Sequence, residues 1–252
     1  MYSNQMFLLS VAGFDPSGGA GILADIRTFE HHKQYGLGVI TANTIQNDSE
    51  FSAVDWIETK RVIDQIDILL KKYSVNFVKI GLVKDFNSLD EIISRLTFYN
   101  SEVKIIWDPV IKATAGETFH NQIDYKLLSK ILNQIYVLTP NLDEVKILFP
   151  ENYLDDAELN DIINRYDFNL LLKGGHSNEK KIVDKLFTQS GIEIFEGEKF
   201  PGYSKHGTGC VFSSALTASL ANGNSLAESC SNAKKYVEKF ILSNKTNLGS
   251  HF

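Results

Sequence analysis

Short apolar runs alternate with segments of helical periodicity along most of the chain. In residues 21–35 and 58–73 the apolar side chains recur every three or four positions, which predicts two amphipathic helices. The apolar runs end in Gly, Pro or polar residues, as buried strands do, and they cover residues 7–13, 38–42, 76–81, 103–109, 135–141 and 168–175. Strands that alternate with helices predict an α/β fold whose mostly parallel sheet is covered by helices on both faces.

The C-terminal part of the chain departs from this alternation. Residues 182–188 and 192–200 predict an antiparallel hairpin about Gly191. Two helices follow, and the second is predicted to begin at Ser225 with a capping box to Glu228. The 252 residues are 43% hydrophobic and show no internal repeat or linker, so we expect one domain over residues 1–252.

Charge and composition narrow the class of protein. The net charge is −6, and Lys and Arg are interspersed among acids, which argues against a nucleic-acid partner. The apolar runs are too short to span a membrane, and the first residues do not resemble a signal peptide. The two cysteines, Cys210 and Cys230, have no metal-ligand spacing. We therefore expect a cytoplasmic protein without disulfide or zinc.

Polar and glycine-rich residues follow nearly every predicted strand. The carboxyl ends of parallel strands meet at one edge of a sheet, where ligands bind in such folds. The segments at this edge are "GFDPSGGAG", "NTIQND", Gly81, "DP", "TPN" and "KGG". Chance would place one or two such segments there, so the whole set predicts a shared binding site.

The strongest local motif is "HGTGC", residues 206–210, at the predicted start of a helix made of small residues. Gly207 and Gly209 allow a tight turn, and the helix N-terminus presents free N–H groups, so the motif predicts an anion site. The helix dipole favours the thiolate of Cys210 by lowering its pKa. The alternative is a tight turn with a small buried thiol, which is the reading that suits Cys230.

The other candidate residues each have an ordinary structural alternative. Asp25 is either a solvated helix residue or a ligand contact. Asp108 suits Mg²⁺ held through water, or an Asp-Pro turn. Glu144 follows Asn141 by three residues, and this spacing alone favours an N-terminal helix cap. Lys173 suits a phosphoryl group, or a solvated strand end.

The motifs together resemble the ribokinase superfamily. "VAGFDPSGGAGILADIRTF", "VITANTIQN", "KIGLV", "WDPV", "TPNLDE", "KGGH" and "HGTGCVFSSAL" occur in the order of its vitamin-kinase branch, in particular the hydroxymethylpyrimidine/phosphomethylpyrimidine kinases of thiamine biosynthesis. The resemblance covers nearly the whole chain. It implies a three-layer α/β/α sandwich, MgATP as phosphoryl donor, and a hydroxymethylpyrimidine that is phosphorylated first on its alcohol and then on the resulting monophosphate.

The resemblance also implies the roles of individual residues. The pyrimidine pocket comprises Gly13, Asp25, Gln46, Leu82 and Val110. The ATP site comprises Asn141, Lys173, Gly175 and Thr208, with Asp108 and Glu144 near Mg²⁺. The anion hole comprises Gly207, Thr208 and Gly209, and Cys210 stands where most of the superfamily has a catalytic Asp. A neutral thiol there would tolerate a substrate that already carries phosphate, whereas a fixed carboxylate would repel it.

The sequence departs from the family's pattern in places. Leu82 replaces a methionine, and Trp107 stands where a smaller aliphatic residue is usual. Lys112 has no assignment, and residues 112–117 and 176–181 are candidate flaps. These departures remove no chemical group that the reaction needs.

Two alternatives remain open. A pyridoxal kinase of the same branch can also carry a glycine-flanked cysteine, but Gln46 and Asn47 resemble the pyrimidine enzymes. A pyrimidine-sensing module without catalysis would need Asp25 and Gln46 but not Cys210, Lys173 or Glu144, and all three of these are present. An oxidoreductase is disfavoured because the first glycine turn lacks dinucleotide-binding spacing. A homodimer is compatible with all of these readings.

Overall fold

The sheet of the protein has nine strands in the order β3-β2-β1-β4-β5-β6-β7-β8-β9. We describe a computed structural model, covering residues 6–111, 123–150, 155–174 and 181–251. The strands are β1 Phe7–Phe14, β2 Tyr35–Gln46, β3 Phe51–Trp56, β4 Val75–Ile80, β5 Lys104–Trp107, β6 Val137–Leu138, β7 Asn169–Leu172, β8 Lys181–Thr188 and β9 Gly191–Glu198. The six strands from β2 to β7 in this order are parallel, whereas β3, β8 and β9 pair antiparallel. The prediction of a mostly parallel sheet is confirmed.

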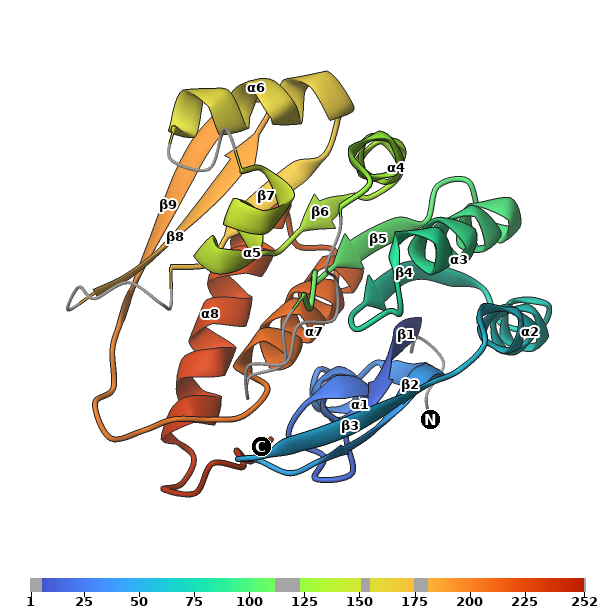
Figure 1. Ribbon diagram of the computed structural model, residues 1–252. Helices are drawn as coiled ribbons and strands as arrows, with labels where there is room; N and C mark the ends of the chain where they lie inside the picture. The colour runs from blue at the N-terminus through green and yellow to red at the C-terminus, as the bar shows by residue number, and fades with distance from the viewer. Residues whose placement is uncertain (1–5, 112–122, 151–154, 175–180, 252) are drawn as a thin grey trace.

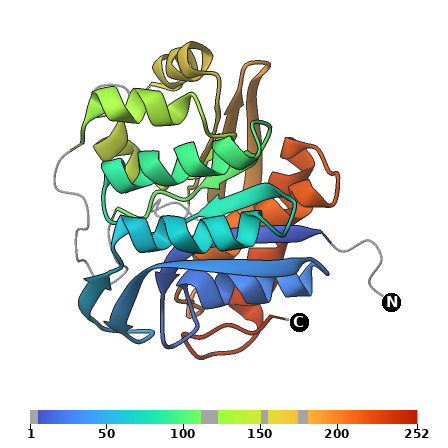
Figure 2. The ribbon, with the colours of Figure 1, turned by 90° about the vertical axis from the view of Figure 1, so that its right-hand side faces the viewer.

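Helices cover both faces of this sheet (Figure 1). They are α1 Gly21–His31, α2 Thr59–Leu70, α3 Phe86–Tyr99, α4 Tyr125–Leu132, α5 Leu142–Leu148, α6 Asp156–Tyr166, α7 Thr208–Ala221 and α8 Leu226–Leu242. Helices α2, α3 and α4 stack side by side on one face (Figure 2), and residues of α5 and α6 join the same core. Helices α1, α7 and α8 pack on the opposite face. The result is the expected three-layer α/β/α sandwich.

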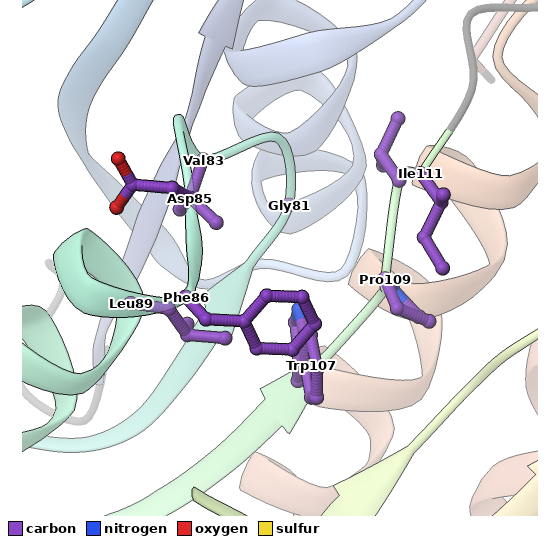
Figure 3. Close-up of a pocket in the computed structure, with 9 residues that line it drawn as sticks. Gly81, Val83, Asp85, Phe86, Leu89, Trp107, Pro109 and Ile111 are labelled. Atoms are coloured by element: carbon purple, nitrogen blue, oxygen red, sulfur yellow. The ribbon is translucent and has the colours of Figure 1, made fainter. Parts of the chain in front are cut away.

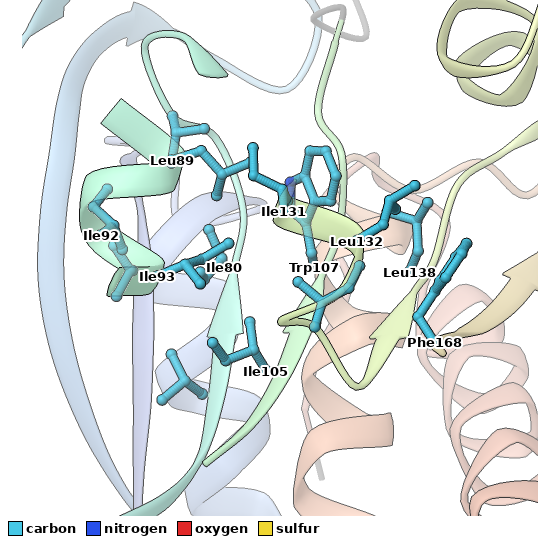
Figure 4. Packing of buried hydrophobic residues seen from close by; sticks show 14 of the residues in the cluster. Ile80, Leu89, Ile92, Ile93, Ile105, Trp107, Ile131, Leu132, Leu138 and Phe168 are labelled. Atoms are coloured by element: carbon cyan, nitrogen blue, oxygen red, sulfur yellow. The ribbon is translucent and has the colours of Figure 1, made fainter. Parts of the chain in front are cut away.

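Each strand serves both cores because successive side chains point to opposite faces. In β5, Ile105 and Trp107 pack with Ile131 and Leu138 in the larger core, whereas Ile106 packs against α7. Figure 4 shows this larger core between the sheet and α3 and α4. Strands that are buried on both faces are continuously apolar, which explains why the strand runs are readable in the sequence.

The structure corrects three predicted boundaries. Helix α1 ends at His31 rather than at residue 35, because Lys33 takes a left-handed φ of 63° and turns the chain into β2. Strand β2 continues to Gln46 and pairs with β3, which the sequence did not suggest. Strand β6 has only two residues, although the apolar run around it spans 135–141.

The C-terminal predictions are confirmed. Strands β8 and β9 form the hairpin about Gly191, and α7 and α8 follow it. The hydroxyl of Ser225 accepts the Glu228 N–H, and the Glu228 carboxylate accepts the Ser225 N–H, which completes the predicted capping box. Among the described residues, none of the helices combines the length and apolarity needed to cross a membrane.

Candidate active site

A cleft of about 1060 Å³ opens at the edge of the sheet where the parallel strands end. It collects the candidate residues that the sequence placed on separate loops. Those that line it are Gly13, Gln46, Leu82, Val110, Asp108, Asn141, Glu144, Lys173, Gly207, Thr208, Gly209 and Cys210. Asp25 is not among the lining residues, and Gly175, Lys112 and the two candidate flaps lie outside the described residues, except for Lys181 at the start of β8.

The N-terminus of α7 forms one wall of the cleft. Gly207 is the residue before the first turn and has a left-handed φ of 76°. A Cβ atom at Gly207 would lie 2.0 Å from the carbonyl oxygen of Gly19, so this position excludes any other residue. The two glycine-containing turns, 15–20 and 206–209, therefore interlock. This packing leaves the first N–H groups of a 14-residue helix facing the cleft, which suits an anion.

A buried histidine and aspartate join the same two turns. His206 Nε2 lies 2.9 Å from Asp15 Oδ2, and Asp15 also accepts the N–H groups of Ser17 and Ala20. Burial raises the pKa of Asp15, but the bonds from His206, Ser17 and Ala20 outweigh it and hold the pKa below its usual range. Sequence reasoning missed this pair because the two residues are 191 positions apart.

Cys210 lies half-buried in the first turn of α7. Burial raises the pKa of its thiol to about 11, although Lys79 and the Gly21 N–H oppose this effect. The expectation that the helix dipole would favour the thiolate is therefore wrong for the empty site, since loss of hydration dominates. The thiol is therefore predominantly neutral at neutral pH.

Asp108 and Lys173 form an ion pair close to the start of this helix. Lys173 Nζ lies 2.8 Å from Asp108 Oδ1, and Ser213 of α7 donates to Asp108 Oδ2 at 3.3 Å. Burial opposes ionisation of Asp108, but Lys173 and Lys79 lower its pKa on balance. A Cβ at Gly209 would lie 3.4 Å from Lys173 Nζ, which shows how close this cation is to the start of α7.

Asn141 and Glu144 form a capping box at the start of α5. The Asn141 side chain accepts the Glu144 N–H, and Glu144 Oε2 accepts the Asn141 N–H at 2.7 Å. The predicted N-terminal helix cap is thus confirmed, and Glu144 also lines the cleft. Burial raises the pKa of Glu144 to about 7, with Asp108 adding to the shift and Lys173 opposing it.

The donor set near Asp108 and Glu144 fits a magnesium ion that is shared with phosphate groups. Asp108 raises the pKa of Glu144, and neighbouring carboxylates of this kind are typical of a cation site. Within the described residues, no group of three or more His, Cys, Asp or Glu side chains is arranged to hold a metal by itself. Substrate phosphates and water would therefore supply the remaining ligands.

The structure places Asp25 beneath the cleft rather than on its surface. Its carboxylate accepts two bonds from Lys79 and one each from Ser10 and Ser214, and its exposed fraction is 0%. This differs from the expectation that Asp25 binds the pyrimidine amine, because its acceptor positions are already filled. Lys79 was also missed; the signal was a charged residue between Val78 and Ile80 in an apolar strand, which requires a buried partner.

The other end of the cleft is narrow and mostly apolar. A Cβ at Gly13 would lie 3.0 Å from Leu82 Cδ2, so Leu82 closes this end as a wall residue. Gln46, half-buried at the end of β2, supplies the polar side chain. Trp107 does not line the cleft. Its ring packs edge-on against that of Phe86, with 6.1 Å between the ring centroids, and both side chains line a small second cavity (Figure 3).

A ribokinase-like kinase is defined by three features together: the sheet order, the start of α7 between two glycines, and the lysine and carboxylates close to it. The model of the family described as phosphomethylpyrimidine kinase matches residues 15–252. A hydroxymethylpyrimidine/phosphomethylpyrimidine kinase of Staphylococcus aureus is 32% identical over 92% of this chain and 87% of its own. One from Aquifex aeolicus is 31% identical over 95% of this chain and 96% of its own. The chain belongs to the phosphomethylpyrimidine kinase family.

Solved structures agree on the fold. The phosphomethylpyrimidine kinase of Clostridium difficile is 29% identical, with a TM-score of 0.78 over 93% of this chain and 99% of its own. The pyridoxal kinase of Staphylococcus aureus in complex with ADP has a TM-score of 0.85 at 24% identity, over 99% of this chain and 94% of its own. The second likeness establishes the ribokinase-like fold and leaves the acceptor to be argued from the cleft.

Proposed function

We propose that the protein transfers the γ-phosphoryl group of ATP to 4-amino-5-hydroxymethyl-2-methylpyrimidine and then to the monophosphate of this alcohol. The observation that carries the proposal is the single cleft that holds Gln46 and Leu82 at one end and Lys173 at the other, with Cys210 between them in the chain's anion site. Relatives named for this activity cover nearly the whole chain. The cytoplasm is the compartment that we propose for the reaction.

The residues of the cleft divide the work of phosphoryl transfer. The thiolate of Cys210 takes the proton of the substrate hydroxyl, the hydroxyl oxygen forms a bond to the γ-phosphorus, and the bond from phosphorus to the bridging oxygen of ADP breaks. The N–H groups of Thr208 and Gly209 face the charge that builds on the transferring group. Lys173, close to the start of α7, balances the same charge. Mg²⁺ bound near Asp108 and Glu144 would neutralise phosphate charge.

The cleft extends past Lys173 toward α8, where we place the nucleotide. Ile182, Val237 and Ile241 provide apolar surface there that suits stacking of a flat base, and the charged side chains of Asp184, Lys234 and Glu238 also line this part of the cleft. Structures of pyridoxal kinases with ADP and AMP-PCP show that the fold accepts adenine nucleotides. Asn141 and Thr208 lie between this region and the pyrimidine end, where the phosphates would pass.

Gln46 supports the pyrimidine as acceptor. An amide can donate to a ring nitrogen and accept from an exocyclic amine, which matches the edge of an aminopyrimidine. Asp25, which the sequence offered as a second such contact, is occupied by Lys79, so Gln46 and backbone groups near Gly13 carry the recognition in this proposal.

The second candidate acceptor is pyridoxal, because several of the structural neighbours are pyridoxal kinases. The test is a panel of both alcohols with MgATP and masses of the products. We expect the pyrimidine to gain one and then two phosphoryl groups. Faster turnover of pyridoxal would overturn the choice of acceptor, and binding without ATP consumption would indicate a sensing module.

A further inference from the structure

An ion pair with no solvent exposure lies under the floor of the cleft. Lys79 Nζ is 2.8 and 2.9 Å from the two carboxylate oxygens of Asp25, and both side chains are 0% exposed. The hydroxyls of Ser10 and Ser214 complete the hydrogen bonds to the carboxylate. The pair thus joins β1, α1, β4 and α7. Burying two charges costs desolvation free energy, so a buried pair beside an active site suggests a role in the chemistry.

The backbone places this pair directly beside Cys210. Ser214 follows Cys210 by four residues in α7, so the hydroxyl that binds Asp25 and the thiol lie on the same face of the helix. Ser10 and Lys79 are register partners in β1 and β4. A Cβ at Gly81 would lie 2.8 Å from Lys79 Nζ, so the chain leaves room there for the ammonium. Lys79 and Cys210 both border the cleft.

Lys79 is not placed to bind substrate itself. Its ammonium is fully buried and held by Asp25, so it acts on the cleft through its charge. Burial is the main cause of the raised pKa of Cys210; Asp25 and Asp108 reinforce it, and Lys79 opposes it more strongly than either carboxylate reinforces it. The pair therefore favours the charged thiol on balance, although its own net charge is zero.

We propose that Lys79 is a positioning residue for catalysis whose ammonium stabilises the thiolate of Cys210, and that Asp25 holds this ammonium in place while its negative charge limits the effect. The inference rests on the proposed function, because the thiolate matters to the reaction only as the acceptor of the hydroxyl proton. It assigns Asp25 a role in the charge of the base instead of in pyrimidine binding. The Lys79–Asp25 pair then sets how much of the enzyme holds a thiolate at a given pH.

The test is the pH dependence of Cys210 alkylation by iodoacetamide, which reacts with thiolates. A Cys230→Ala background leaves Cys210 as the only thiol. The double variant Lys79→Met/Asp25→Asn removes both charges without leaving one unpaired. We expect its alkylation midpoint to rise, so that the rate below the midpoint falls about tenfold for each pH unit of the shift. Asp25→Asn alone should move the midpoint in the opposite direction.

A matched control is Asp184→Asn/Lys234→Met. This pair is also largely buried, with side chains 8% and 11% exposed and 2.6 Å between Asp184 Oδ2 and Lys234 Nζ, but it joins β8 to α8 in the part of the cleft where we place the nucleotide. Its loss should leave the Cys210 midpoint unchanged. An unmoved midpoint in the Lys79 double variant, or an equal shift in the control, would overturn the inference. If the Lys79 double variant does not fold, as seen by circular dichroism, the direction of the shift in Asp25→Asn decides.

The alkylation experiment uses no kinase substrate, so its result is independent of the acceptor. A shifted midpoint together with preference for pyridoxal would reject the proposed function and retain the role of Lys79. Pyrimidine phosphorylation with an unmoved midpoint would retain the function and reject that role.

Discussion

His206 Nε2 lies 2.9 Å from Asp15 Oδ2, and this buried pair holds two distant turns against each other. The turn at 15–20 precedes α1, and the turn at 206–209 precedes α7. The backbone N–H of His206 also donates to the carbonyl of Asn247 in the C-terminal segment. The position of the anion site therefore depends on contacts that lie outside the site itself.

Asp15→Asn should weaken this junction. An amide NH₂ would face one of the N–H donors that the carboxylate now accepts, and the charge-assisted bond to His206 would be lost. We expect the free energy of unfolding to fall by about 1–3 kcal/mol. The value of kcat should fall as well, because Gly207 is no longer fixed against Gly19. Urea denaturation and steady-state kinetics measure the two effects.

Asp155→Asn is the control for this prediction. Asp155 caps α6 and does not line the cleft. Because Asn caps a helix about as well as Asp, its variant should keep nearly all of its stability, with kcat unchanged. If Asp15→Asn also leaves kcat unchanged, the His206–Asp15 pair serves stability alone.

Gln46→Met should impair recognition of the pyrimidine and leave the use of ATP intact. Loss of a hydrogen-bonding partner in the cleft costs about 1–3 kcal/mol, or roughly 5- to 150-fold in kcat/KM for the pyrimidine. The KM for ATP should not change, because Gln46 lies at the opposite end of the cleft from Lys173. Gln134→Met, in the α4–β6 turn outside the cleft, is the control. An unchanged KM for the pyrimidine would remove Gln46 from the pocket.

The sequence predicted the edge of the sheet where the cleft lies because buried parallel strands are apolar throughout and end in polar turns. It did not predict β3. In this strand polar and partly exposed residues alternate irregularly, and a bulge interrupts its pairing with β2. Local periodicity is weak in such an edge strand.

The candidate site was predictable where a motif is local and not where partners meet only in the fold. "HGTGC" carries its own geometry: glycines, a turn and a helix start. The residues of the Lys79–Asp25 pair are 54 positions apart in the sequence, and those of the His206–Asp15 pair are 191 positions apart. The sequence therefore does not show that the members of each pair are partners. For Cys210, the helix start was visible but its burial was not, and burial decides the pKa.

Glu144 should make the stability of the protein depend on pH. Its pKa is about 7 in the folded protein, above its ordinary value of 4.5, because burial disfavours the carboxylate. The folded state therefore binds the proton more tightly than the unfolded state does, and this contribution is complete below about pH 4.5. It is lost as the pH rises from there through about 7. Mg²⁺ should reduce the loss, since it favours the ionised form.

Glu144→Gln and Glu144→Ala separate the two roles of this residue. The amide of Gln can still accept the Asn141 N–H, so Glu144→Gln should keep the helix cap and lose the pH-dependent contribution. Both variants should need more Mg²⁺ for half-maximal rate, and Glu144→Ala should also melt at a lower temperature. Thermal melts from pH 5 to 8 and Mg²⁺ titrations of the rate give the comparison. A normal Mg²⁺ requirement in both variants would leave Glu144 as a cap only.

Cys210 gives the sharpest test of the mechanism. With a thiol pKa of about 11, the thiolate is a minor species at neutral pH, so the rate of the chemical step should rise with pH up to that range. Cys210→Ala should keep the N–H groups of the anion hole and lose about 10²–10⁴ in rate without the rise, while KM for the pyrimidine changes little. Single-turnover rates against pH measure both properties.

Cys210→Asp separates the base from its charge. A carboxylate is already ionised at neutral pH and can take the hydroxyl proton, so phosphorylation of the alcohol should survive in part and lose its steep rise with pH. Phosphorylation of the monophosphate should fall further, because a fixed negative charge would face a phosphorylated substrate in a poorly screened cleft. Single-turnover rates for both substrates are compared in wild type and variant. Equal losses for the two steps would reject the argument that a neutral thiol is there to admit the monophosphate, and near-normal rates in Cys210→Ala would leave Cys210 as a small residue at the start of α7.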